Sequence, residues 1–205
     1  MKQLFVTGIS TEVGKTVVSS ILTEYLQADY WKPIQSGDLH FSDTMKVQSL
    51  VSNSKSVFHP ERYRLQSPLS PHASAEIDGI QISLNDFELP QTENNLIVEG
   101  AGGLFVPLNE KDTVIDLIER LKLPVVLVSR NYLGSINHTM LSIEALKVRG
   151  IKIEGIVFNG ETTPATERFI EENSHIPVLF RLNELTELTK STIKSTAEAS
   201  QIQFK

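Results

Sequence analysis

The chain has 205 residues, of which 40% are hydrophobic and 21% are charged, and its formal net charge at pH 7 is −6. This length and composition are typical of one large globular domain that buries a core without disulfides. The acidic balance argues against a nucleic-acid partner held through its phosphates, and the lack of cysteine excludes a thiolate nucleophile. The longest apolar runs are too short to span a bilayer and no signal-peptide pattern is present, so we expect a cytoplasmic protein without a membrane partner.

Short apolar runs alternate along the chain with longer amphipathic stretches, which is typical of strand–helix units that build a parallel sheet. This pattern predicts a single α/β domain over residues 1–205, with a doubly wound, mostly parallel sheet flanked by helices. Residues 53–95 are expected to be irregular, and residues 187–205 to form either a peripheral helix or a frayed tail. The predicted strands cover residues 4–6, 30–34, 95–99, 125–128, 153–159 and 178–180. The predicted helices cover residues 16–27, 43–51, 114–121, 136–148 and 165–173.

The junction between the first strand and the first helix reads GISTEVGKT at residues 8–16. Backbone N–H groups at such a junction point at an anion, and the helix N-terminus adds partial positive charge. Lys15 can reach the β- and γ-phosphates of a nucleotide, and the hydroxyl of Thr16 can bind Mg²⁺. The spacing departs from the Walker A pattern, because the nearest glycine is Gly8 where the pattern requires one at position 9. A helix cap followed by a solvated lysine is the alternative, but the position after a first strand favours a phosphate site of the P-loop NTPase kind. Residues 8–16 are called the phosphate loop below.

The second predicted strand, residues 30–34, overlaps the segment WKPIQSG at residues 31–37 and is expected to end in a turn at residues 35–37. Ligands of open α/β sheets bind at the carboxyl ends of the strands, which places Lys32 beside the phosphate loop. A lysine there can neutralise a transferring phosphoryl group, whereas the alternative is an exposed lysine at a strand end. Asp43 follows at the start of the next predicted helix, where it is either a helix cap or a carboxylate ligand for a hard cation.

The strand at residues 95–99 ends in Glu99 and continues into the glycine-rich residues 100–103. An acid in this place brings a carboxylate to the ligand edge of the sheet, and the glycines allow the backbone to approach phosphates. A Walker B acid has the same task of helping to hold Mg²⁺. A glycine turn alone does not explain the charged residue, so we predict that Glu99 is a magnesium ligand.

Several of these segments resemble the dethiobiotin synthetase family, a group of ATP-dependent enzymes of biotin synthesis. The resemblance covers residues 1–160 and fades in the last quarter of the chain. The segments that carry it are TEVGKT at 11–16, KPIQSG at 32–37, SD at 42–43, PLSPHA at 68–73, VEGAGG at 98–103, LGSINH at 133–138 and Asn159.

The resemblance implies Lys15 and Lys32 as catalytic residues, with ATP as co-substrate and Mg²⁺ as cofactor. The residues implied in ATP binding are Glu12, Val13, Gly14, Lys15, Thr16, Val17, Asp43, Glu99, Gly100, Ala101, Gly102 and Asn159. Magnesium ligands are implied at Thr16, Asp43 and Glu99. The residues implied in substrate binding are Thr11, Ser36, Gly134, Ser135, Ile136 and Asn137, and the last four would serve the neighbouring site across a homodimer interface.

The activity that the resemblance implies is that of a ligase forming C–N bonds: 7,8-diaminononanoate, CO₂ and ATP give dethiobiotin, ADP and phosphate. A ParA/MinD-like switch ATPase that acts through protein partners is the main alternative. Those ATPases carry a signature lysine where this chain has Ser10, and a glycine where it has Glu12. A synthetase domain related to cobyrinate amidation is a third possibility that would share the loop but not the substrate.

Overall fold

The main sheet of the computed structural model, which describes residues 1–204, has seven strands in the order β4-β2-β6-β1-β7-β8-β9. All neighbouring strands in this sheet run parallel. The predicted parallel α/β sheet is therefore confirmed. Its strands are β1 Gln3–Gly8, β2 Asp29–Trp31, β4 Phe58–His59, β6 Leu96–Gly103, β7 Val125–Arg130, β8 Ile153–Asn159 and β9 Val178–Leu182.

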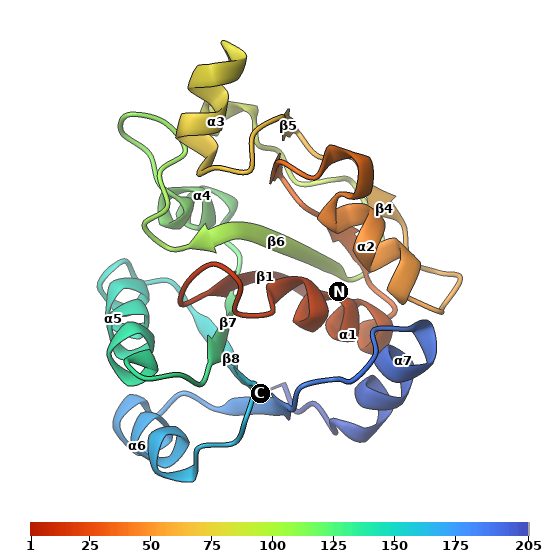
Figure 1. Ribbon diagram of the computed structural model, residues 1–205, viewed down its shortest axis with the longest axis vertical. Coiled ribbons are helices and arrows are strands. Elements are labelled where there is room, and N and C mark those ends of the chain that lie inside the picture. Colours follow the sequence, from red (N-terminus) through yellow and green to blue (C-terminus); the bar gives the residue numbers. More distant parts are fainter. Residues whose placement is uncertain (205) are drawn as a thin grey trace.

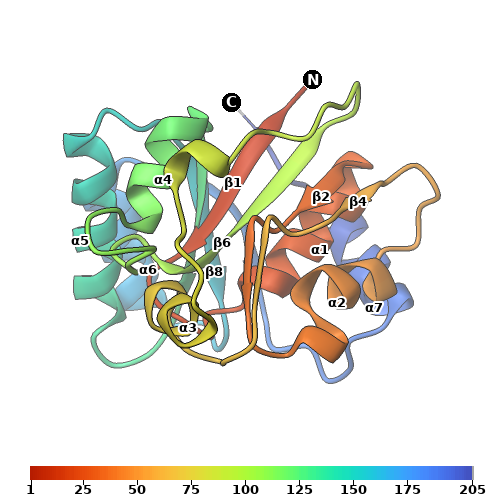
Figure 2. The same ribbon diagram turned by 90° about the horizontal axis from the view of Figure 1, so that it is seen from above.

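Helices cover both faces of the sheet, as the doubly wound prediction requires (Figures 1 and 2). One layer contains α1 Lys15–Leu26, α2 Asp43–Leu50 and α7 Lys190–Ala199. The other contains α4 Val114–Leu121, α5 Ser135–Val148 and α6 Pro164–Ser174. The residues of a strand alternate between the two faces, so Leu4 and Val6 of β1 join the core under α1, while Phe5 joins the opposite core.

The predicted strand over residues 30–34 is wrong as one element, because the chain leaves the main sheet after Trp31. Pro33 has no N–H to donate to a sheet ladder, and its carbonyl instead accepts from the N–H of Tyr63 at 3.0 Å. The chain then forms β3 (Ile34–Ser36), which pairs with β5 (Tyr63–Leu65) in a separate two-stranded sheet. The SG turn expected at residues 35–37 therefore begins as strand.

The region 53–95 is more regular than its prolines predicted. Besides β4 and β5 it contains α3 (Pro71–Asp78), which begins with proline at its first position. Short 3₁₀ turns lie at Leu84–Asp86 in this region and at Leu39–Phe41 before α2. Together with the small sheet, α3 forms a lobe beside the carboxyl end of β6 (Figure 1).

The tail is a packed helix over residues 190–199 rather than a frayed end. Thr189 caps α7 by accepting from the N–H of Thr192 at 3.2 Å. Ile193 and Ala197 are buried in the core shared with α1. No helix within residues 1–204 is long and apolar enough to cross a membrane.

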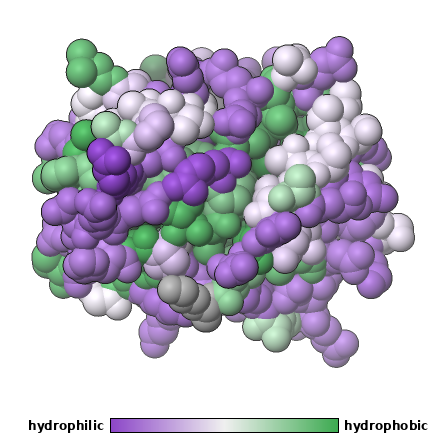
Figure 3. Space-filling view, turned by 90° about the horizontal axis from the view of Figure 1, so that it is seen from below, coloured by the Kyte–Doolittle hydropathy of each residue, from purple (hydrophilic) through white to green (hydrophobic). Residues whose placement is uncertain are grey.

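The surface at the β9 end of the sheet carries an apolar area bordered by polar side chains (Figure 3). Arg181 of β9 donates to Glu167 of α6 at 2.6 Å. This ion pair places charge at the exposed strand edge, which discourages pairing with another strand.

Candidate active site

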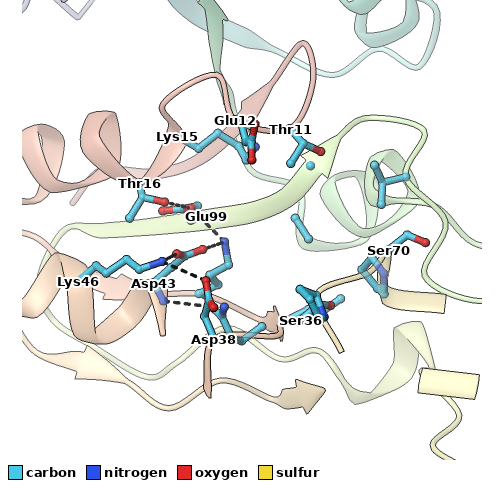
Figure 4. A pocket seen from close by; sticks show the side chains of 18 of the residues that line it. Thr11, Glu12, Lys15, Thr16, Ser36, Asp38, Asp43, Lys46, Ser70 and Glu99 are labelled. Atoms are coloured by element: carbon cyan, nitrogen blue, oxygen red, sulfur yellow. Dashed lines mark hydrogen bonds and ion pairs between the residues drawn. The ribbon is translucent and has the colours of Figure 1, made fainter. Parts of the chain in front are cut away.

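A cleft of about 780 Å³ opens at the carboxyl ends of β1 and β6, beside the point where the chain leaves β2 (Figure 4). The phosphate loop and the start of α1 form one wall, and residues 34–38 with residues 68–71 form the other. Glu99 lies between them in Figure 4. The predicted residues that line the cleft are Thr11, Glu12, Gly14, Lys15, Thr16, Val17, Lys32, Ser36, Asp43, Glu99, Ala101 and Gly102.

Steric constraints in the phosphate loop explain its unusual glycine spacing. A Cβ atom on Gly8 would lie 2.4 Å from Cγ2 of Val13 and 2.8 Å from the carbonyl oxygen of Ser10. Gly14 has φ of 93°, and a Cβ there would lie 2.3 Å from Nδ2 of Asn159. Both glycines are therefore required by close approach of the chain, although Gly8 stands one position outside the Walker A pattern.

The side chains of the first two residues of α1 contact different parts of the site. Lys15 curls back so that its Nζ donates to the Ser10 carbonyl at 3.2 Å. Burial, with the positive charge of Lys32 added, lowers the pKa of Lys15 to about 8. The hydroxyl of Thr16 donates to Oε1 of Glu99 at 2.9 Å, which links the loop to β6.

Lys32 lies in a buried ion-pair cluster opposite the loop. Its Nζ is 3.0 Å from Oε1 of Glu99 and 2.6 Å from Oδ2 of Asp43, and both Lys32 and Glu99 are at least 95% buried. Burial opposes the lysine charge, but the two carboxylates outweigh it and hold the pKa of Lys32 above its usual value. Burial also opposes ionisation of Asp43, yet Lys32 holds the pKa of that carboxyl below its usual value. Lys32 and Asp43 are therefore both charged at neutral pH.

Two residues that the sequence analysis did not select contact the acids of this cluster. Lys46 donates to Oδ1 of Asp43 at 3.1 Å, and the hydroxyl of Tyr30 donates to Oε2 of Glu99 at 2.9 Å. Burial and the Glu99 charge raise the pKa of Tyr30 well above its usual value, so the phenol remains a donor. Lys46 lies three residues after Asp43, a spacing that places both on one face of a helix. Tyr30 lies two residues before Lys32, a spacing that places both on one face of a strand. These spacings are the signals in the sequence that indicate the two residues.

Some predicted site residues do not line the cleft. Val13, Gly100 and Asn159 are not among its lining residues, and the Asn159 amide donates to the Val13 carbonyl at 2.8 Å. Asn159 therefore supports the phosphate loop from the side opposite Lys32. The four residues Gly134, Ser135, Ile136 and Asn137 surround the start of α5, also outside the cleft.

The oxygens at the site match the ligands that Mg²⁺ prefers. Thr16 donates to Glu99, and the Lys32 ammonium joins Glu99 to Asp43, so one hydroxyl and two carboxylates are linked in one chain of contacts. Within residues 1–204 no group of three acidic or histidine side chains forms a complete metal cage. Mg²⁺ usually takes one or two carboxylates and completes its shell with phosphate and water, so these residues fit a magnesium ion that arrives with a nucleotide.

The structure has three features of the class of P-loop nucleotide-binding proteins. These are a parallel sheet, a loop that leads into a helix N-terminus, and an acid on the adjacent strand. Solved structures share this fold: MinD from Pyrococcus horikoshii, solved with Mg-ADP, superimposes with a TM-score of 0.61 at 13% identity, covering 98% of this chain and 92% of that one. MinD from Pyrococcus furiosus gives a TM-score of 0.53 at 13% identity, covering 97% of this chain and 98% of that one.

Sequence comparison identifies the family. A family model described as "AAA domain" matches residues 2–192. The ATP-dependent dethiobiotin synthetase BioD of Christiangramia forsetii is 54% identical over 96% of this chain and 95% of its own length. The synthetase of the same name from Cytophaga hutchinsonii is 47% identical over 96% of both chains. The chain belongs to the family of ATP-dependent dethiobiotin synthetases, and the resemblance found in its motifs is confirmed.

Proposed function

We propose that this protein uses ATP to carboxylate 7,8-diaminononanoate with CO₂ and to close the ring of dethiobiotin. The observation that carries this proposal is that a single cleft holds the phosphate loop on one wall and Lys32 with the KPIQSG segment on the other. A nucleotide phosphate and a small substrate can therefore meet between Lys15 and Lys32. The family membership supports the same reaction.

The proposed reaction has three balanced steps. One amine nitrogen of the substrate forms a bond to the carbon of CO₂ and loses a proton, giving a carbamate. A carbamate oxygen attacks the γ-phosphorus, and the bond to the bridging oxygen breaks to release ADP. The second amine nitrogen then attacks the carbonyl carbon, the C–O bond breaks, and phosphate leaves as the ring closes and a second proton is lost.

The protein contributes positive charge and orientation more than covalent chemistry. Lys15 and the loop N–H groups would hold the β- and γ-phosphates, and Lys32 would face the transferred group from the other wall. Charge that is fixed in place before the reaction stabilises developing negative charge without reorganisation, which is the largest electrostatic advantage of an enclosed site. Ser36 supports a substrate contact, because its hydroxyl is buried in the cleft wall with no hydrogen-bond partner among residues 1–204.

We also propose that Thr16, Asp43 and Glu99 hold Mg²⁺ when nucleotide is bound. The ion would neutralise phosphate charge during the transfer. Ala101 and Gly102, which line the cleft beside Gly100, would lie against the rest of the nucleotide, and Asn159 would act by fixing the loop through the Val13 carbonyl.

A homodimer completes this proposal. The start of α5 has no side-chain cap, and the preceding Leu133 has a fully exposed side chain, although Ser135 itself is buried and its N–H donates to the Tyr132 carbonyl. A helix N-terminus of this kind suits a carboxylate, and the segment is not part of the cleft of its own chain. We infer that residues 134–137 bind the substrate carboxylate in the cleft of a second copy.

The experiment that tests the function is phosphate release from ATP in the presence of Mg²⁺, with and without the diamine and bicarbonate. We expect release only when both are present, with one dethiobiotin formed for each phosphate. A switch ATPase would hydrolyse ATP without regard to the diamine, and that result would contradict the proposal. The likeness to MinD shows the fold alone, and Ser10 stands where the signature lysine of such ATPases would be.

A further inference from the structure

Tyr30 is buried against the site although it belongs to no motif of the phosphate loop. It lies in the middle of β2, two residues before Lys32, and its Cα pairs with Ile97 of β6. Because side chains alternate along a strand, Tyr30 shares the α1 face of the sheet with Ile97 and Glu99, while Trp31 joins the core on the other face. The ring is fully buried and packs against Phe58 with their centroids 6.4 Å apart.

The two oxygens of Glu99 have different partners. Oε1 accepts from Thr16 at 2.9 Å and from Lys32 at 3.0 Å, on the side that faces Asp43. Oε2 accepts from the hydroxyl of Tyr30 at 2.9 Å, in a bond in which both groups are buried. The Tyr30 bond therefore decides which oxygen of the acid is turned towards the cleft.

We propose that Tyr30 is a positioning residue that orients Glu99 for a divalent cation by holding its second oxygen. The inference rests on the magnesium site in the proposed function, and it adds a residue that the family motifs do not include. Outer partners of this kind fix the rotation of a metal ligand, and their removal typically weakens metal binding about 10- to 100-fold. A phenylalanine keeps the ring and its contact with Phe58 but leaves Oε2 without its donor.

The opposing interpretation is that the hydroxyl only satisfies a buried carboxylate oxygen and stabilises the fold. If the bond is purely stabilising, its loss would lower the unfolding temperature without changing how strongly metal binding and nucleotide binding depend on each other. Metal dependence is therefore the measurement that separates the two roles.

The test compares the wild-type chain with Tyr30→Phe, Glu99→Gln and the control Tyr63→Phe. Tyr63 also donates its hydroxyl to a carboxylate, that of Asp86, but outside the cleft. The dissociation constant of ADP is measured by calorimetry in EDTA and across a series of Mn²⁺ concentrations. For Tyr30→Phe we expect the Mn²⁺ concentration that gives half of the maximal change in ADP affinity to rise about 10-fold. The dissociation constant of ADP in EDTA should change less than about twofold. Tyr63→Phe should match the wild type.

The outcomes distinguish the role of Tyr30 from the magnesium site on which that role depends. If Glu99→Gln keeps the metal dependence of the wild type, the magnesium assignment itself is wrong and the role of Tyr30 falls with it. If Glu99→Gln loses metal dependence but Tyr30→Phe does not, the inference alone is overturned. Equal weakening of ADP binding with and without Mn²⁺, or a Tyr30→Phe chain that does not fold in thermal unfolding, would assign the hydroxyl to stability and also overturn it.

Discussion

At the scale of single residues, the centre of the site is a buried cluster of one ammonium and two carboxylates, and each of these groups needs the others to be buried there. Lys32 would be costly to bury without Glu99 and Asp43, and the two acids would repel each other without Lys32. Removing one member of such a cluster leaves an uncompensated buried charge, so the three side chains depend on one another. This dependence keeps an ammonium group in the cleft, opposite the phosphate loop.

Replacement of Lys32 by glutamine tests the catalytic role of that ammonium. We expect Lys32→Gln to bind ATP nearly as well as the wild type, because the phosphate loop is unchanged, while ring closure falls about 100- to 1,000-fold. The measurements are calorimetric binding of ATP and the rate of dethiobiotin formation. The control is Lys55→Gln, since Lys55 is exposed, does not line the cleft, and donates its ammonium to Gln27. A Lys32→Gln enzyme with wild-type turnover would remove Lys32 from the mechanism.

At the scale of elements, β2 is held in the sheet by a buried acid at its first residue. The carboxylate of Asp29 accepts from the N–H of Val57 at 2.9 Å, the hydroxyl of Thr92 at 2.6 Å and the amide of Asn94 at 3.1 Å. These bonds tie β2 to the chain before β4 and to the chain before β6. Because β2 carries Tyr30 and leads directly into Lys32, its position determines where these side chains meet Glu99.

The same network predicts a pH-dependent contribution to stability. Burial opposes ionisation of Asp29, but the donors outweigh burial and hold its pKa below the usual value of 3.8. The stabilisation is therefore present at pH 7 and is lost as the pH falls through 3.8 towards the lower pKa of the folded state. We expect Asp29→Asn to lose about 1–3 kcal/mol of the free energy of unfolding at pH 7, and less as the pH approaches 3. Urea unfolding at both pH values measures this, and a difference that does not change with pH would contradict it.

At the scale of the whole molecule, the proposed substrate site needs two chains. The cleft lies beside α1 and β6, whereas the four residues at the start of α5 lie outside it. In the proposed homodimer, one chain would supply the phosphate loop and Lys32, and a second copy would supply the helix N-terminus for the carboxylate.

Mixing two inactive variants tests this arrangement. Lys32→Gln and Asn137→Ala would each lose activity alone, because every site of either homodimer carries a defect. In a heterodimer, one cleft combines intact Lys32 with intact Asn137 from the other chain, so an equal mixture should recover about a quarter of the wild-type activity. Product formation is measured after the chains exchange. No recovery in a mixture shown by mass spectrometry to contain heterodimers would place both residues in the same site.

The sequence by itself determined the class of fold, the phosphate loop and the position of Glu99. These features depend on local patterns: apolar runs alternating with amphipathic stretches, glycines beside a lysine at a strand–helix junction, and an acid at the end of an apolar strand. Such patterns require only a few consecutive residues, so they can be recognised without knowing which segments meet.

Only the tertiary structure decided how the rest of the site is assembled. Tyr30 and Lys32 meet Glu99 across 69 and 67 residues of chain, and Asn159 supports the phosphate loop across 146. The break of the second predicted strand at Pro33 and the packing of α7 on α1 likewise depend on distant partners. Contacts of this kind are made by the order of strands in the sheet and by the faces to which side chains point. The local sequence determines neither of these. The partners of Glu99 therefore depend on β2 and β6 being neighbours in the sheet.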